Sequence, residues 1–159
     1  MTLKDVDVQL QKALRPVVKA WKGAMGPNLV SVVLFGSRAR GEAKPDSDWD
    51  LFVVADGLPE RITERSRFLL SFLPVNWRYW TAVIAKTTAE FESALPPLYL
   101  DIALDGIILH DSNGYMATKL AYISQRLAEM GLERRQQGQD WIWLWRTPPG
   151  KNWELEWKR

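Results

Sequence analysis

The feature that most constrains the fold is a pair of apolar segments joined by a short polar one. Residues 29–35 and 49–55 are near-continuous runs of β-branched and other apolar side chains. Such runs are typical of strands that are buried on both faces. The first run leads directly into Gly36-Ser37, and the second begins inside the motif Asp48-Trp-Asp50. The sequence therefore predicts two central strands with a polar connection between them.

Helical spacing of apolar residues accounts for much of the remaining chain. The spacing predicts a first helix over 4–24, which Pro16 should kink or divide. It also predicts a helix from Pro59 through Leu73, a short helix capped by Thr87 or Thr88 and extending through Phe91, a helix from Pro96 to Gly106, and a long helix over 116–130 with Gly131 as its C-cap.

Further strands are expected at 77–85 and 107–109. The order is then helix, strand, strand, helix, strand, helix, strand, helix. Near the C-terminus, residues 141–145 and 153–157 both alternate with a period of two, and Pro148-Pro149-Gly150 separates them. This pattern predicts a terminal Trp-rich β-hairpin.

Composition excludes several kinds of site. The 159 residues include no Cys and a single His, so the chain has no disulfide, no Cys nucleophile and no zinc site built on several His or Cys. Any metal must be held mainly by carboxylates, which indicates Mg²⁺ or Mn²⁺. No apolar stretch approaches the roughly 20 residues that span a membrane, and the N-terminal segment lacks a signal peptide's apolar core. We expect a cytoplasmic protein without a membrane partner.

Two carboxylates stand next to the second strand. Because strand residues two apart share a face, Asp48 and Asp50 should point to one side and Trp49 to the other. Converging carboxylates can hold divalent cations, which neutralise a triphosphate and orient an in-line attack on its α-phosphate.

The Gly-Ser turn would receive the phosphates. Gly36 lets the backbone approach a phosphate closely, and Ser37 adds a hydroxyl donor. A short helix beginning near Arg38 would aim backbone N–H groups at an anion. Arg38, Arg40 and Lys44 could balance the remaining phosphate charge.

A purely structural interpretation of the same residues is also open. Asp48 could cap the start of a strand, Asp50 could be a turn residue, and the arginines could lie in a solvated loop. Short motif matches carry a high risk of false positives. The combination is more specific, since it needs a strand before Gly-Ser, ten intervening residues, and Asp-x-Asp entering another strand.

The stretch GSRARGEAKPDSDWDLFV resembles the signature of the DNA polymerase β-like nucleotidyltransferase superfamily, and in particular its minimal members. The resemblance implies an α/β (α+β) nucleotidyltransferase fold with a mixed sheet flanked by helices. It implies transfer of a nucleoside monophosphate from an NTP to a hydroxyl acceptor with release of pyrophosphate. It also implies that Gly36 and Ser37 contact the phosphates and that Asp48 and Asp50 are the catalytic metal ligands, with Arg38 or Arg40 assisting nucleotide binding. We expect residues 1–112 to form this core and residues 113–159 to form an extension packed on it.

The sequence departs from the superfamily at one place. Active members usually carry a third carboxylate on a later neighbouring strand, but residues 76–85 contain no acid, and Asn76 is a weak substitute. Glu90 and Asp101 are the nearest acids downstream, both on predicted helices. The chain could therefore be an enzyme with a relocated base, or a catalytically weak or inactive, antitoxin-like domain that binds nucleotide or a partner.

The acceptor and the partners stay open at this stage. The acceptor could be a protein, an RNA or a small molecule, and similar minimal nucleotidyltransferases act on or pair with a helical toxin-like partner. Trp141, Trp143 and Trp145 would share one strand face and would cover a core, or else form a homodimer or nucleic-acid surface. The arginines at 61, 65 and 67 should line a solvated helix face, and His110 should be structural.

Overall fold

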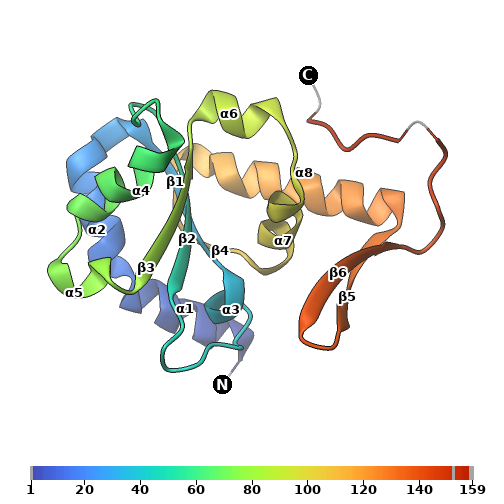
Figure 1. Ribbon diagram of the computed structural model, residues 1–159, viewed down its shortest axis with the longest axis horizontal. Coiled ribbons are helices and arrows are strands. Elements are labelled where there is room, and N and C mark those ends of the chain that lie inside the picture. The colour runs from blue at the N-terminus through green and yellow to red at the C-terminus, as the bar shows by residue number, and fades with distance from the viewer. Residues whose placement is uncertain (1, 152, 158–159) are drawn as a thin grey trace.

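A mixed four-stranded sheet forms the centre of the molecule (Figure 1). The computed structural model describes residues 2–151 and 153–157. The strand order is β3-β2-β1-β4, with β2 parallel to β3 and β1 antiparallel to both its neighbours. This confirms the predicted mixed sheet, whose strands are β1 (Leu29–Phe35), β2 (Trp49–Ala55), β3 (Thr81–Lys86) and β4 (Ile107–Asp111).

Helices cover both faces of this sheet (Figure 1). One face packs against helices α1 (Leu3–Ala13), α2 (Arg15–Met25) and α4 (Ile62–Ser71), and the other against α6 (Thr88–Ser93), α7 (Pro97–Asp105) and α8 (Tyr115–Met130). Side chains of β2 alternate between the two resulting clusters, because Leu51 belongs to the first and Phe52 to the second. Each face thus has its own hydrophobic core, as the two apolar runs predicted.

Several predicted helix boundaries are confirmed. The N-terminal helix is divided at Leu14, and Pro16 lies in the first turn of α2, where its missing N–H costs nothing. Thr87 caps α6 in a capping box with Glu90, and Gly131 ends α8 in the left-handed conformation at φ +67°.

Other predicted boundaries were wrong. Helix α4 begins at Ile62 rather than Pro59, and the segment expected to start the third strand forms the short helix α5 (Val75–Arg78). Asn76 is therefore on a helix, and β3 begins only at Thr81. Two 3-10 turns, η1 (Gly26–Asn28) and η2 (Ser112–Gly114), complete the core.

The C-terminal hairpin is present, but residues 141–145 pair with an earlier segment than the predicted 153–157. β6 (Asp140–Trp145) pairs with β5 (Leu132–Gln137), while residues 153–157 form no strand. β5 was missed because its sequence, LERRQQ, has one apolar residue in six and no alternation. Gly138, at φ +64°, makes the tight turn between the two strands.

The tail beyond the hairpin returns to the core. The indole nitrogen of Trp157 donates to the carbonyls of Phe91 and Ala94, at 2.9 Å each. Helix α8 shares the second cluster with Phe52, so the extension and the sheet bury common apolar surface. The division at residue 112 and the homodimer stay predictions, and residues 1, 152, 158 and 159 lie outside the described part. Among the described helices, none has the length and apolarity needed to cross a membrane.

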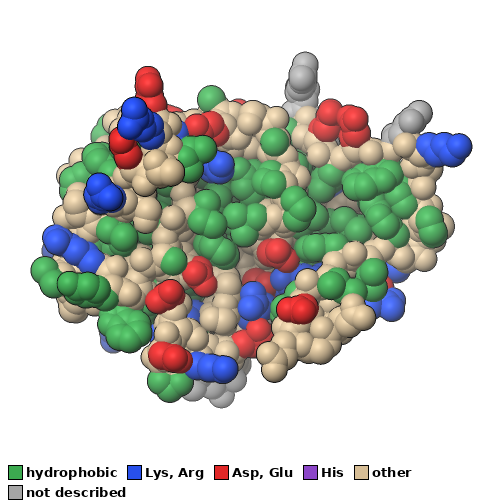
Figure 2. Space-filling view, in the orientation of Figure 1, with side chains coloured by type: hydrophobic (Ala, Val, Ile, Leu, Met, Phe, Trp, Pro, Cys, Tyr) green, Lys and Arg blue, Asp and Glu red, His purple; other side chains and the backbone are tan. Residues whose placement is uncertain are grey.

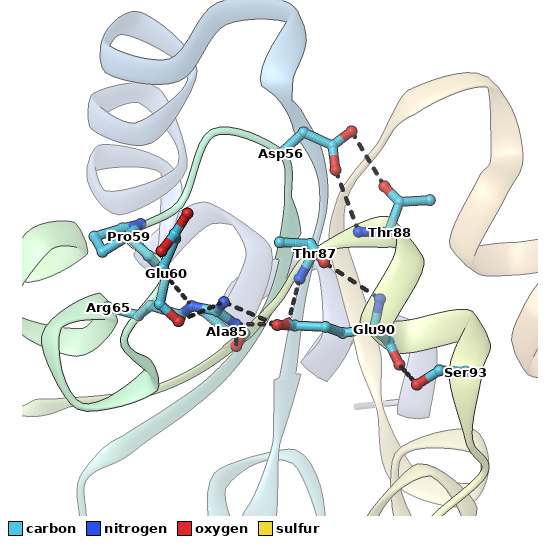
Figure 3. A network of polar contacts seen from close by, with 9 residues as sticks. All are labelled: Asp56, Pro59, Glu60, Arg65, Ala85, Thr87, Thr88, Glu90 and Ser93. Atoms are coloured by element: carbon cyan, nitrogen blue, oxygen red, sulfur yellow. Dashed lines mark hydrogen bonds and ion pairs between the residues drawn. The ribbon is translucent and has the colours of Figure 1, made fainter.

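The prediction that the arginines of α4 are solvated was wrong for Arg65, which is buried. Its side chain is 4% exposed, and its guanidinium donates to both carboxylate oxygens of Glu90 at 2.6 and 2.9 Å (Figure 3). It also donates to the carbonyls of Pro59 and Ala85. This arginine joins α4, β3 and α6 from inside the structure.

Candidate active site

The two aspartates of the motif lie where β1 ends and β2 begins. Asp50 pairs with Phe35, the last residue of β1, and Asp48 comes two residues earlier. Since Phe52 faces the α7–α8 side of the sheet, Asp50 faces that side as well. Trp49 faces the opposite side and packs against Trp77, with ring centroids 5.8 Å apart.

Gly36 packs directly against the carboxylate of Asp50. Its backbone has φ +73°, and a Cβ built there would overlap Oδ2 of Asp50 and lie 3.1 Å from its Cγ. The carboxylate thus rests directly on the first residue of the Gly-Ser turn. A single ligand can therefore touch the turn and the carboxylate together.

The pKa of Asp50 is raised above its ordinary value. Burial is the main cause and the neighbouring charge of Asp48 the second, while Arg40 and Arg38 oppose the shift. A divalent cation between the two carboxylates would relieve this repulsion, and oxygen ligands suit Mg²⁺ or Mn²⁺. Within the described residues no group of three or more acidic, His or Cys side chains is arranged to hold a metal ion. The two aspartates fit such an ion if phosphate and water oxygens complete its coordination.

Arg38 holds the loop that ends at Asp48. Its Nη2 and Nε donate to the carbonyl of Ser47 at 2.6 and 3.1 Å, and Nε also reaches the carbonyl of Asp48 at 3.2 Å. The guanidinium lies 4.1 Å from the ring centroid of Trp49. These contacts fix the backbone just before β2, so Arg38 positions Asp48.

The turn itself is a short helix, α3 (Gly36–Ala39), which starts at Gly36 rather than near Arg38 as predicted. The carbonyl of Ser37 accepts from the Glu42 amide at 2.9 Å. Arg40 lies just after α3, where it pairs with Glu42 at 2.9 Å and approaches Asp105 at 4.0 Å. Lys44 lies in the exposed part of the following loop.

The strand beside β2 supplies no carboxylate. The register places Ala82 of β3 opposite Asp50 and Thr81 opposite Trp49. Glu90 is not brought to the site, since it is held by Arg65 and by its own helix cap, which lower its pKa to about 2. Asp101 of α7, in contrast, lines a pocket that reaches Gly36.

This pocket brings Asp101, a candidate from the sequence, together with Asp105 and Arg134, which sequence reasoning did not assign to the site. Asp101 and Asp105 both bind Arg134 of β5, and Trp141 of β6 lies beside them. The spacing of the two aspartates, four residues apart on a predicted helix, could have indicated a shared acidic face. Arg134 gave no such signal, because its strand was not predicted.

Comparison with known proteins identifies a matching family. Residues 12–110 match the nucleotidyltransferase domain family. A relative from Methanocaldococcus jannaschii, named "Putative protein adenylyltransferase MJ1305", is 42% identical over 60 residues, which are 38% of this chain and 41% of the relative. This match thus spans less than half of that protein's length.

One solved structure shares the fold, and a second gives a weaker match. A crystal structure of a toxin–antitoxin with AMP-PNP has a TM-score of 0.51 and 22% identity, and the similarity covers 72% of this chain and 90% of that one. A structure of the toxin–antitoxin MntA–HepT has a TM-score of 0.45 and 21% identity, over 76% and 91% of the two chains. The family match covers well over half of the chain and includes the Gly-Ser turn and both aspartates, so this protein belongs to the nucleotidyltransferase domain family.

Proposed function

We propose that this protein transfers a nucleoside monophosphate from an NTP to a hydroxyl group, with Asp48 and Asp50 holding Mg²⁺ or Mn²⁺. The observation that carries the proposal is the packing of the Asp50 carboxylate on Gly36, beside Asp48. In the reaction, the acceptor oxygen bonds to the α-phosphorus, the bond from that phosphorus to the β-phosphate oxygen breaks, pyrophosphate leaves, and the hydroxyl proton passes to water.

Each residue has a separate part in this scheme. Gly36 and Ser37 receive the triphosphate, and Arg40 offsets its charge from the end of α3. Arg38 keeps the loop of Asp48 in place. The metal supplies charge stabilisation for the transferred phosphoryl group.

The acceptor hydroxyl is proposed to lie on a protein side chain. The name of the archaeal relative supports this choice, because it describes an adenylyltransferase that acts on protein. The partner is proposed to be a helical, toxin-like protein, as the resemblance to minimal nucleotidyltransferases implies. A toxin–antitoxin complex is also among the structures that share the fold.

The test uses NTPs labelled at the α-phosphate. The purified protein is incubated with each NTP, Mg²⁺ and a lysate of its own organism, and both pyrophosphate release and labelled products are measured. We expect metal-dependent label on protein that is lost in Asp48→Ala and Asp50→Ala. Glu64→Ala, an exposed carboxylate on α4, should retain it. Full activity in both aspartate variants would refute the proposal, and label on RNA or a small molecule would refute the protein acceptor.

A second candidate function is nucleotide binding without transfer. The observation that favours it is Ala82, which occupies the place beside Asp50 on β3 where a third carboxylate would lie. This function predicts Mg²⁺-dependent NTP binding with no pyrophosphate release in the presence of any acceptor. Turnover that needs Asp50 would exclude it.

A further inference from the structure

A pocket of about 180 Å³ opens beside the Gly-Ser turn. Its walls come from three parts of the chain: the end of β1 with α3, helix α7, and the C-terminal hairpin, with Phe35, Gly36, Leu98, Asp101, Arg134 and Trp141 among its lining residues. Figure 2 shows acidic and basic side chains gathered between α3 and the hairpin. Because Gly36 touches both this pocket and Asp50, a ligand bound at the turn can extend into the pocket.

Arg134 joins the hairpin to α7 within the pocket. Its guanidinium donates to both oxygens of Asp105, at 2.6 and 2.7 Å, and to Oδ1 of Asp101 at 3.0 Å. The side chain is 7% exposed, and its Nε is buried without a hydrogen-bond partner in the described part of the chain. A charge buried to this degree holds the hairpin against α7 in one arrangement.

Asp101 keeps one carboxylate oxygen available. Among the described residues only Oδ1 is engaged, and the side chain is 38% exposed where it lines the pocket. Asp105, by comparison, uses both oxygens on Arg134. Oδ2 of Asp101 can therefore accept a hydrogen bond from a ligand N–H group.

The other walls suit a flat ring. Trp141 lies over the guanidinium of Arg134, 4.6 Å from it to the ring centroid, and is 36% exposed. Phe35 and Leu98 add apolar surface. Aromatic side chains stack on nucleobases whatever their sequence, and carboxylates accept from the exocyclic amino groups of adenine and cytosine.

We infer that this pocket binds the base of the NTP, with Trp141 along the ring and Asp101 accepting from an exocyclic amino group. The inference rests on the proposed function, since the triphosphate must lie on Gly36 and Ser37. It assigns the C-terminal hairpin a part in substrate selection. Bases that present an amino group to Asp101 are selected over bases that lack one.

The experiment compares three ligands in the presence of Mg²⁺: ATP, purine riboside triphosphate, which lacks only the amino group, and tripolyphosphate, which lacks the nucleoside. Dissociation constants are measured for the wild type, Asp101→Ala, Trp141→Leu and the control Glu64→Ala. Asp101→Ala keeps both bonds between Arg134 and Asp105, and alanine suits a partly exposed helix position, so the variant should fold.

We expect the wild type and Glu64→Ala to bind ATP about tenfold more tightly than purine riboside triphosphate. Asp101→Ala should bind the two nucleotides equally, and Trp141→Leu should weaken both about tenfold. Tripolyphosphate binding should not weaken in any variant. Two outcomes would overturn the base pocket alone, provided that the wild type binds tripolyphosphate. One is a wild type that binds ATP and purine riboside triphosphate equally. The other is an Asp101→Ala variant that still prefers ATP to purine riboside triphosphate. A wild type that binds neither ATP nor tripolyphosphate would overturn the proposed function and the pocket with it.

Discussion

Gly36 and Asp50 are packed so closely that Gly36 has no room for a side chain. The space that a Cβ would fill is occupied by the Asp50 carboxylate, whose Cγ would be 3.1 Å away. Gly36 also has φ +73°, a conformation that glycine adopts without strain. The first strand, the Gly-Ser turn and the Asp48-Trp-Asp50 motif thus meet at one contact between backbone and carboxylate.

The first prediction concerns this contact. Gly36→Ala should lower nucleotidyl transfer at least a hundredfold, because the new methyl group must displace the Asp50 carboxylate. Gly41→Ala is a matched control, since Gly41 has the same φ of +73° but nothing within 4 Å of the added Cβ. Both variants should lose about 1 kcal/mol of unfolding free energy to backbone strain, measured by urea denaturation. Equal activity in the two variants would contradict the steric role of Gly36.

The second prediction concerns metal binding without reference to turnover. Mg²⁺ should raise the melting temperature of the wild type but not that of Asp50→Asn, measured by differential scanning fluorimetry. The pKa of Asp50 is raised, so Asp50 becomes protonated at a higher pH than an ordinary aspartate. As pH falls, the Mg²⁺ effect should therefore be lost at a higher pH than it would be for an ordinary aspartate.

The same raised pKa has a consequence for the metal-free protein. A folded-state pKa above the unfolded value stabilises the fold at low pH, and that contribution is lost as pH rises. At neutral pH the ionised Asp50 is therefore unfavourable, and Asp50→Asn should melt at a higher temperature than the wild type without metal. A Mg²⁺ shift of equal size in the variant would exclude Asp50 as a ligand.

The central fold was predictable because local and long-range preferences agree there. β1 and β2 are apolar on both faces and lie between two helical layers, so period and burial indicate the same element. Strand alternation correctly predicts that Asp50 and Trp49 face opposite sides of the sheet. Asp48 precedes β2, and its backbone is held by Arg38. The position of the motif Asp48-Trp-Asp50 after a Gly-Ser turn located the candidate site without any structure.

The other contacts depend on partners that are distant in sequence. Arg65 resembles its exposed neighbours on α4 until Glu90, 25 residues later, reaches it from α6. β5 carries too few apolar residues to be recognised, and its strand character comes from pairing with β6. The pocket lined by Asp101, Arg134 and Trp141 could not be predicted for the same reason, because its walls meet only after the hairpin has packed on α7.

The third prediction concerns Arg38 as a positioning residue. Arg38→Ala removes the contacts to the carbonyls of Ser47 and Asp48 and to the Trp49 ring, so residues 40–48 should become more mobile. Amide hydrogen exchange in this loop should accelerate, and NTP affinity should fall about tenfold. Arg67→Ala, an exposed arginine on α4, should change neither quantity. Lost affinity with unchanged exchange would instead indicate that Arg38 binds phosphate directly.

The fourth prediction concerns the ion pair between Arg65 and Glu90 (Figure 3). Glu90→Gln should lower the unfolding free energy at pH 7 by about 1–3 kcal/mol, less than for a fully buried pair because the Glu90 side chain is 37% exposed. The pKa of Glu90 is about 2, below its ordinary value of 4.5, so its stabilisation is complete above pH 4.5 and is lost as pH falls toward 2. Urea denaturation from pH 7 to pH 2 should therefore show the wild type and the variant converging in stability at the acid end.

Glu64→Gln, whose exposed pair with Arg61 spans 3.6 Å, should change stability by less than about 0.5 kcal/mol throughout. A stability difference between wild type and Glu90→Gln that stays constant with pH would show that the charge of Glu90 contributes nothing and that only the shape of its side chain matters.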